Sequence, residues 1–300
     1  MDTRNIQYFM AVYEQLHFTR AAEELGISQP TLSQQIRALE NELGIPLFDR
    51  IGKKVVVTEA GKMFKHYGTK MLQAEMDIKT AATELKSGNQ GEIRLAALPS
   101  DLDFRLVPLF VRFKTKYPDT RLQVISTIFA HEEVLSHKVD LGIGLQGLTD
   151  DRLTHIPLGS EPYHLFVRAD SQLARRKRIT LEDLKAHPLV MYPKGYVGRD
   201  LVDATCRKLG FELSTAMETA SAASLLQLVS AGIGATIQPA GLIGQNGGDY
   251  PDIVAIPLSG VEPVRHLELT YYADRFLTGA QRELIRWLTD FFAEMQTGGS

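Results

Sequence analysis

Hydrophobic positions at the start of the chain recur at the three-and-four spacing of an amphipathic helix. One side of this first helix carries four apolar residues: Ile6, Phe9, Met10 and Tyr13. A second, shorter helix is expected over residues 19–25, with Thr19 capping its start and Gly26 ending it in a left-handed turn. The segment therefore begins as two helices joined by a tight turn.

A third helix follows, and its two faces differ. Ser28 can cap its start, and Pro30 falls in the first turn, where a missing N–H costs nothing. The apolar stripe comprises Leu32, Ile36, Leu39 and Leu43. The opposite side carries Gln29, Pro30, Thr31, Ser33, Gln34 and Arg37, with the acids Glu40 and Glu42 kept to the far end. Such side chains can reach base edges in a DNA major groove, where Gln pairs with adenine and Arg with guanine or phosphate. The alternative is a small helical domain with a solvated polar face.

The pattern then changes to that of a short hairpin with a basic tip. Residues 45–50 and 55–58 are the arms, and the sequence GKK lies between them at 52–54. A wing of this kind brings Arg50, Lys53 and Lys54 near phosphates or a minor groove, which favours DNA binding over the alternative.

Residues 60–85 follow a heptad repeat, because their apolar or small positions alternate in steps of four and three. These positions are Ala60, Phe64, Tyr67, Met71, Ala74, Ile78, Ala81 and Leu85. The opposite side is charged and carries Lys62, Lys65, Lys70, Glu75, Lys79 and Glu84. The 3.5-residue period predicts pairing with a second helix, and packing on the helix's own domain is the alternative. Residues 87–91 (SGNQG) break the pattern and indicate a hinge.

From Glu92 onward the pattern alternates between strand and helix. Strands are expected over 93–97, 122–125 and 140–144, and helices over 104–113 and 132–136. This alternation predicts an α/β fold with parallel sheets. Gly142, Gly144 and Gly147 match the dinucleotide pattern G-x-G-x-x-G, but no helical stripe follows them, so nucleotide binding is not expected. We expect these glycines to let the strand end pass close to a ligand cleft.

Small-molecule ligands of open α/β sheets bind at the carboxyl ends of strands, near helix amino termini. The residues at such places are Pro99, Ser100, Thr127, Ile128, Gly147, Pro193, Lys194, Gly195, Tyr196, Thr219 and Ser221. The alternative for each hydroxyl is that it only caps a helix. Asp101 and Asp103 argue against an anionic ligand, whereas Lys194 and Arg199 argue for one, so the sequence leaves the sign open.

Composition narrows the picture further. The 300 residues suit about two domains, and 44% hydrophobic residues provide a sizeable core. With a net charge of −3, a DNA-binding protein must concentrate its positive charge locally. The single cysteine, Cys206, excludes an internal disulfide and a thiol-rich metal site; a packed thiol is expected there, with a redox switch as the alternative. The basic run at 175–178 is expected to be a solvated loop. No signal peptide or membrane span is expected, which favours the cytoplasm.

The stretch from residue 9 to residue 61 closely resembles the DNA-binding domain of LysR-type regulators. The matching segments are FTRAA (18–22), SQPTLSQQI (28–36), LE (39–40), LG (43–44), LFDR (47–50) and TEAG (58–61). Val57 stands where the family usually has Leu. The resemblance runs through nearly the whole chain, and within the family it is most similar to the cyanate-regulator-like branch.

The resemblance implies three parts: an amino-terminal winged helix-turn-helix (1–58), a linker and dimerisation helix (59–87), and a two-lobed effector domain (88–300) resembling periplasmic solute-binding proteins. Lobe I is expected over 91–161 and 266–300 and lobe II over 162–265, with the chain crossing near Glu161 and Arg265. The family's effector lies between the lobes, and Ser100 and Thr127 match its commonest polar contacts.

We therefore expect a transcription regulator that binds double-stranded promoter DNA as a homodimer or homotetramer, engages RNA polymerase and responds to a small-molecule effector, without a cofactor. An enzyme is the first alternative, but the sequence lacks a nucleophile motif, a metal-ligand cluster and a credible cofactor loop. A solute-binding protein is the second, but it would need an export signal and has no use for a helix-turn-helix.

Overall fold

The computed structural model describes residues 1–51, 54–87, 91–147, 149–243 and 250–297, with backbone alone at 50–51, 80, 83–87 and 296–297. The chain divides into two compact units, Met1–Lys86 and Ser87–Ser300, which are described separately. Among the described residues, no helix is both long and apolar enough to cross a membrane.

The first unit opens with three helices: α1 (Thr3–Gln15), α2 (Phe18–Glu24) and α3 (Gln29–Leu43). The prediction of Thr19 as a cap is wrong, because the His17 ring takes that place and accepts from Arg20 N at 3.4 Å. Ser28 Oγ accepts from Thr31 N at 3.3 Å, and Gly26 has φ +66°, as the sequence predicts.

A ring cluster forms the core of this unit. Phe9 of α1 lies 5.1 Å from Phe48 and 4.7 Å from Phe64, measured between ring centroids. The hairpin pairs β1 (Phe48–Ile51) with β2 (Lys54–Val57) in antiparallel register. Glu40 Oε1 fixes the turn before β1 by accepting from Leu47 N at 2.8 Å and Phe48 N at 3.1 Å. This acid, which the sequence placed at the end of the polar face, is therefore structural.

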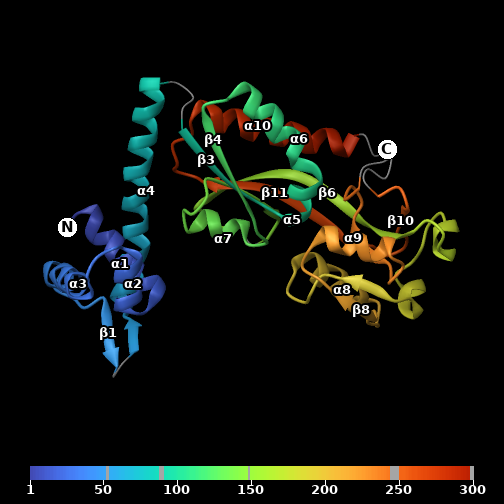
Figure 1. The fold of residues 1–300 in the computed structure, drawn as a ribbon, viewed down its shortest axis with the longest axis horizontal. Helices are drawn as coiled ribbons and strands as arrows, with labels where there is room; N and C mark the ends of the chain where they lie inside the picture. Colours follow the sequence, from blue (N-terminus) through green and yellow to red (C-terminus); the bar gives the residue numbers. More distant parts are fainter. Residues whose placement is uncertain (52–53, 88–90, 148, 244–249, 298–300) are drawn as a thin grey trace. The chain divides into compact units, whose positions relative to one another are not determined.

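Helix α4 (Glu59–Ser87), the long helix of the first unit in Figure 1, has 29 residues. It carries apolar side chains on two different faces. One face packs on its own unit: Phe64 is buried, and a Cβ on Gly68 would lie 2.8 Å from Ile6 Cγ2. The other face is exposed, with 59% of Tyr67, 42% of Met71 and 70% of Ile78 accessible. Part of the predicted seam thus belongs to the unit's own core, because Phe64 completes the ring cluster.

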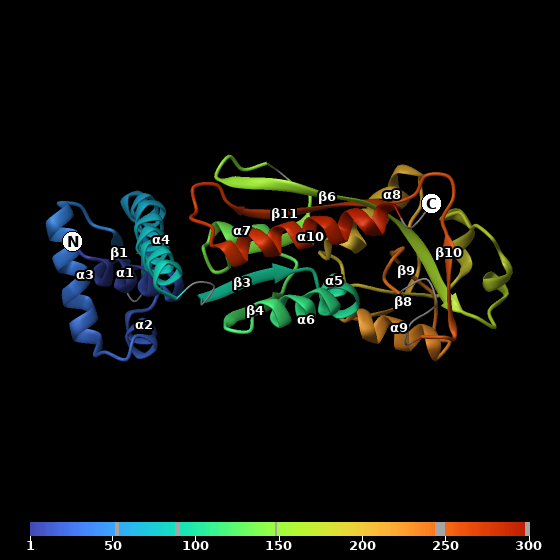
Figure 2. The same cartoon turned by 90° about the horizontal axis from the view of Figure 1, so that it is seen from above.

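The second unit begins with lobe I, whose sheet has the strand order β6-β11-β5-β3-β4 (Figure 2). Strands β3 (Gly91–Ala97), β4 (Thr120–Ser126) and β5 (Leu141–Leu145) are parallel, as expected. The long strands β6 (Leu153–Arg168) and β11 (Val264–Tyr272) run antiparallel to each other, and β11 is antiparallel to β5.

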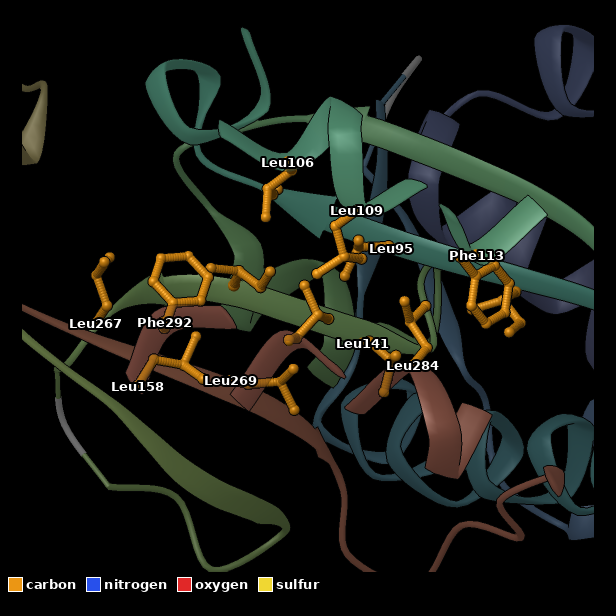
Figure 3. Close-up of a cluster of buried hydrophobic side chains, with 14 of the residues drawn as sticks. Leu95, Leu106, Leu109, Phe113, Leu141, Leu158, Leu267, Leu269, Leu284 and Phe292 are labelled. Carbon is orange, nitrogen blue, oxygen red and sulfur yellow. The ribbon is translucent and has the colours of Figure 1, made fainter. Parts of the chain in front are cut away.

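Helices cover both faces of this sheet (Figure 1). The helical stretch α5 (Pro99–Asp101), η1 (Leu102–Leu106) and α6 (Val107–Lys116) lies on one face with α10 (Gly279–Thr297), and α7 (Ala130–Leu135) on the other. Figure 3 shows the resulting core, in which strand residues meet helix residues. The strands contribute Leu95, Leu141, Leu158, Leu267 and Leu269, and the helices Leu106, Leu109, Phe113, Leu284 and Phe292.

Lobe II is built on the continuation of β6. Beyond Pro162 this strand leaves β11 and pairs with β9 (Thr236–Pro239) and β10 (Ile253–Pro257). The remaining elements are β7 (Leu189–Met191), β8 (Thr215–Glu218), α8 (Val197–Lys208), α9 (Ala222–Ser230) and the 3₁₀ turns η2 (Gln172–Arg175) and η3 (Glu182–Ala186). Arg265 and Glu161, the residues named from the sequence as crossing points, face each other in the β11–β6 register.

Gly142 and Gly144 make room for a helix, whereas the sequence interpretation had them pass close to a ligand cleft. A Cβ on Gly142 would lie 2.9 Å from Ala130 O, and one on Gly144 would lie 3.2 Å from the His131 ring. Both positions therefore let α7 pack closely on β5. A dinucleotide-binding motif needs a helix that begins at its third glycine. The described residues between β5 and β6 contain no helix.

Candidate functional site

The face of α3 that was predicted to read DNA is largely accessible. Pro30, Thr31, Gln34 and Arg37 are exposed, and Gln29 is half-buried. Ser33 is only 8% exposed, so its placement on this face is wrong. It lies three residues before the buried Ile36 and therefore at the edge of the apolar stripe.

The carboxyl end of the apolar stripe on α3 also differs from the prediction. Leu43 is 39% exposed, so the buried part of α3 ends at Leu39. On the wing, Lys54 is exposed at the start of β2. Lys53 and the side chain of Arg50 lie outside the described residues.

A cavity of about 650 Å³ lies between the two lobes of the second unit. Lobe I contributes Pro99, Asp103, Ser126, Thr127, Ile128 and Phe129, and lobe II contributes Lys194, Gly195, Tyr196, Ala220 and Ser221. This cavity brings together seven predicted effector residues: Pro99, Thr127, Ile128, Lys194, Gly195, Tyr196 and Ser221. Ser100 lines a smaller adjoining cavity, whereas Gly147, Pro193 and Thr219 line neither.

The hydroxyls at the cavity also act as caps. Thr127 Oγ1 accepts from Phe129 N at 3.0 Å, and Ser221 Oγ accepts from Ser224 N at the start of α9 at 3.2 Å. A hydroxyl that accepts one hydrogen bond still has its own proton to donate. Capping and ligand binding are therefore compatible at these two residues.

The smaller cavity, about 50 Å³, is lined by the predicted Tyr196 and by two further tyrosines, Tyr163 and Tyr192, that the sequence did not reveal. Tyr192 and Tyr196 stack with ring centroids 5.3 Å apart and an interplanar angle of 6°. Burial raises the pKa of Tyr163 to about 12, so this phenol stays neutral. A Cβ on Gly198 would lie 2.9 Å from Tyr163 Oη, so this glycine makes room for the phenol.

Four charged side chains form a buried network where the two long strands pass between the lobes. Arg265 on β11 donates Nη2 to Asp101 Oδ1 at 2.7 Å and Nε to Glu161 Oε2 at 2.8 Å. Arg105 pairs with the same two acids, with Asp101 Oδ1 at 3.2 Å, and donates Nε to Gly241 O at 3.1 Å. Gly241 N donates to Glu161 Oε1 at 2.6 Å. The network thus ties α5, both crossing strands and lobe II together.

Charge pairing within this network affects the pKa values of Glu161 and Arg265 more than burial does. Burial raises the pKa of Glu161, but the guanidinium groups of Arg265 and Arg105 lower it more, to about 2. Burial lowers the pKa of Arg265, but Asp101 and Glu161 raise it above its ordinary value. Glu161 and Arg265 are therefore ionised at neutral pH.

Two of the four charges that the sequence analysis weighed for the sign of the ligand are paired with protein groups. Asp101 has no exposed surface and faces the two arginines. Arg199 is buried in α8, where Nε lies 2.9 Å from both Asp203 oxygens and Nη1 donates to Tyr192 O at 3.0 Å. Neither residue lines a cavity.

Cys206 is a packed thiol, as expected. Only 1% of it is exposed, and burial raises its pKa to about 11. Within the part of the chain that the structure describes, no group of His, Cys, Asp or Glu is arranged to hold a metal ion.

Known families match both units of the chain. Residues 3–62 match the bacterial regulatory helix-turn-helix protein of the lysR family, and residues 86–293 match the LysR substrate binding domain. The chain belongs to the LysR family. The resemblance drawn from the sequence is thereby confirmed at the family level, as is the fold class.

Individual LysR relatives cover most of the chain. The uncharacterized HTH-type transcriptional regulator YnfL of Escherichia coli (strain K12) is 33% identical over 80% of this chain and 82% of its own length. The hydrogen peroxide-inducible genes activator of Pectobacterium carotovorum subsp. carotovorum is 28% identical over 95% of this chain and 94% of its own. The crystal structure of full-length CbnR complexed with its target DNA superimposes with a TM-score of 0.62 at 23% identity, covering 98% of this chain and 99% of that one. These LysR proteins are regulators, and the chain is not an enzyme.

Glu161 makes the stability of this LysR chain depend on acid pH. Its folded-state pKa lies below the ordinary 4.5, so its contribution is present above pH 4.5 and is lost as the pH falls towards 2. The shift from 4.5 to about 2 corresponds to roughly 3 kcal/mol of unfolding free energy. In Glu161→Gln this part of the acid loss should disappear, and the protein should be less stable by about 3–5 kcal/mol at neutral pH because an arginine loses its partner.

Urea unfolding of the second unit, followed between about pH 2.5 and 7, measures both effects. Glu212→Gln, which changes an exposed carboxylate, is the matched control and should follow the wild-type curve. Parallel pH curves for Glu161→Gln and wild type would contradict the pairing.

Proposed function

We propose that this LysR-type transcriptional regulator binds promoter DNA through α3 and its wing, pairs through α4 and responds to a small molecule bound between the lobes of its second unit. The observation that carries the proposal is the inter-lobe cavity, which gathers seven independently predicted residues from both lobes of a chain that also has a helix-turn-helix. CbnR, with the same fold, is described in complex with its target DNA, which supports the DNA-binding part.

The α4 surface supports self-association. Its exposed face carries Tyr67, Met71 and Ile78 at heptad spacing, on a helix whose other face is already packed. A contiguous exposed apolar stripe of this length favours burial against a second copy. A homodimer or homotetramer follows from this proposal.

The branch of the family, the domain limits and the individual DNA contacts are inferred from the sequence alone. The cyanate-regulator-like branch remains a prediction, since none of the relatives named above is a cyanate regulator. The domain limits 1–58, 59–87 and 88–300 belong to the same proposal, as do contacts of Arg50, Lys53 and Lys54 with DNA. Regulation of a promoter also implies RNA polymerase as a partner and the cytoplasm as the place of action.

A peroxide response like that named for the Pectobacterium relative is not favoured here. A peroxide-sensing thiol needs thiolate character and exposure. Cys206 has neither, and the sequence holds no second cysteine to resolve an oxidised one. We therefore favour a ligand that binds without covalent chemistry.

Base reading by α3 is testable at Gln34. Gln34→Ala should weaken binding to an operator selected from random duplexes by about 1–3 kcal/mol and relax the preference at one base pair, because an amide reads a base edge there. Fluorescence anisotropy on matched and mismatched duplexes measures both quantities. Gln172→Ala, an exposed glutamine of lobe II, is the control. Unchanged operator affinity of Gln34→Ala would remove α3 from the recognition surface.

Pairing through α4 is testable at Ile78. Ile78→Glu should convert the oligomer to monomers in sedimentation experiments, because an unpaired charge buried in the seam costs several kcal/mol. Val261→Glu places the same charge at a residue of lobe II that is 54% exposed and should leave the assembly intact. A wild-type protein that sediments as a monomer at micromolar concentration would refute the pairing.

Ligand binding between the lobes is testable by filling the cavity. A metabolite that raises the melting temperature of the wild type should fail to do so in Thr127→Trp, because the indole occupies the space between the lobes. At a hundred times its Kd a ligand contributes about 2.7 kcal/mol, so its loss is easily measured. Thr115→Trp, at an exposed position of α6, should keep the full shift. A normal shift in Thr127→Trp would place the effector elsewhere.

A further inference from the structure

Two opposite charges line the inter-lobe cavity from opposite sides. Asp103 belongs to η1 of lobe I, and Lys194 belongs to the loop before α8 in lobe II. Among the residues that the structure describes, neither side chain has a hydrogen-bond or ion-pair partner. This distinguishes them from the other charges of the region, which are paired.

The neighbouring charged side chains form ion pairs with other protein groups. Asp101, two residues before Asp103, is held by Arg265 and Arg105. Arg199, five residues after Lys194, is held by Asp203 and Glu218. The two unpaired groups are therefore the charges that remain for a ligand.

Asp103 shows the effect of lacking a cation. Asp103 is an exposed residue, but the partial burial of its carboxyl at the cavity raises the pKa of that group above the ordinary value, and no neighbouring cation offsets this. A cationic group placed in the cavity would relieve this cost. An anionic group would increase it, since like charges repel across a partly desolvated space.

Lys194, on the lobe II wall of the cavity, favours an anionic group on the ligand. Its ammonium is exposed and offers three donors to an anion that reaches the lobe II wall. Ser221 lies on the same wall and keeps its hydroxyl proton for donation. Thr127 offers the same on the lobe I wall.

We propose that the effector is a small zwitterion, with an ammonium group that pairs with Asp103 and a carboxylate or similar anion that pairs with Lys194. Amino acids and their ω-amino relatives are the chemical class. The inference rests on the proposed function of the cavity and adds the ligand's charge pattern, which the sequence left open.

The two charges also explain how such a ligand closes the lobes. A ligand shifts an equilibrium only through its different affinities for the two states. A zwitterion makes both ion pairs only when both walls lie within reach of its ends, so it binds the closed arrangement more tightly. A ligand with one charge engages one lobe and lacks this discrimination.

The test compares matched probes on the full-length protein by isothermal titration calorimetry. The zwitterions are the common L-α-amino acids and the ω-amino acids from β-alanine to 6-aminohexanoate. Each ω-amino acid is paired with the acid that lacks its amine and the amine that lacks its carboxylate. The best zwitterion should bind roughly tenfold or more tightly than either partner, as charged hydrogen bonds of ordinary strength imply.

Two variants test which side chain binds the ammonium group of the probe and which binds its carboxylate. In Asp103→Asn the best zwitterion should bind no more tightly than the corresponding acid, and in Lys194→Met no more tightly than the corresponding amine. Asp119→Asn and Lys208→Met, which neutralise exposed charges outside the cavity, should bind all probes as the wild type does.

Several outcomes would overturn the inference. One is that no zwitterion binds at millimolar concentration, and another is that a singly charged partner binds as tightly as the zwitterion. A third is that Asp103→Asn and Lys194→Met weaken charged and neutral ligands equally, which would mean that the two side chains pair with each other on closure. A ligand that is excluded by Thr127→Trp but indifferent to both charge variants would leave the proposed function standing and remove only the zwitterion. A ligand that still binds Thr127→Trp would remove the inter-lobe cavity as the effector site.

Discussion

The second unit depends on one buried interaction, the network of Asp101, Arg105, Glu161 and Arg265. Among the described residues, β6 continues from the sheet of lobe I into that of lobe II, and β11 begins at the same crossing point. Each strand contributes one residue to this network, Glu161 and Arg265. Buried charges are tolerated when each has a partner in good geometry, and here two cations meet two anions with Gly241 completing the set. Removing any one charge leaves an uncompensated neighbour, so the network fixes the crossing point more strictly than apolar packing would.

The same network decides which charges a ligand meets. By holding Asp101, it removes from the cavity an acid that precedes Asp103 by only two residues. Asp203 and Glu218 do the same to Arg199 in lobe II. The cavity is left with one acid on one wall and one base on the other. The ion pairs of Asp101 and Arg199 therefore determine which charged side chains are left to line the cavity.

Local features were predictable from the sequence, because their causes lie within a few residues. The Ser28 cap, the Gly26 stop and the hairpin are of this kind. Some errors have long-range causes. Arg265, which pairs with Asp101, is 164 residues away in the sequence, and the packing of α7 on Gly142 and Gly144 leaves no local sequence signal. Other errors have local causes, because Arg105 pairs with Asp101 from four residues away and His17 replaces Thr19 as the cap of α2. Tyr163 and Tyr192 of the small cavity were missed because a lone aromatic residue in a strand, or directly after one, carries no spacing signal. The inter-lobe cavity was easier, because the carboxyl ends of strands mark such places in α/β sheets generally.

Helix α4 shows how pairing can be joined to DNA reading. Gly61 and Gly68 let the helix lie directly against Leu47 and Ile6, where any side chain would force the contact apart. Such close packing leaves α4 little freedom to move against α1 and the base of the wing. The exposed face of the helix is on the same rigid body as α3. If two copies pair through that face, a change in how they pair must carry both recognition helices with it and alter their separation on DNA. In that case the close contacts at Gly61 and Gly68 transmit the change in pairing from α4 to the rest of the first unit.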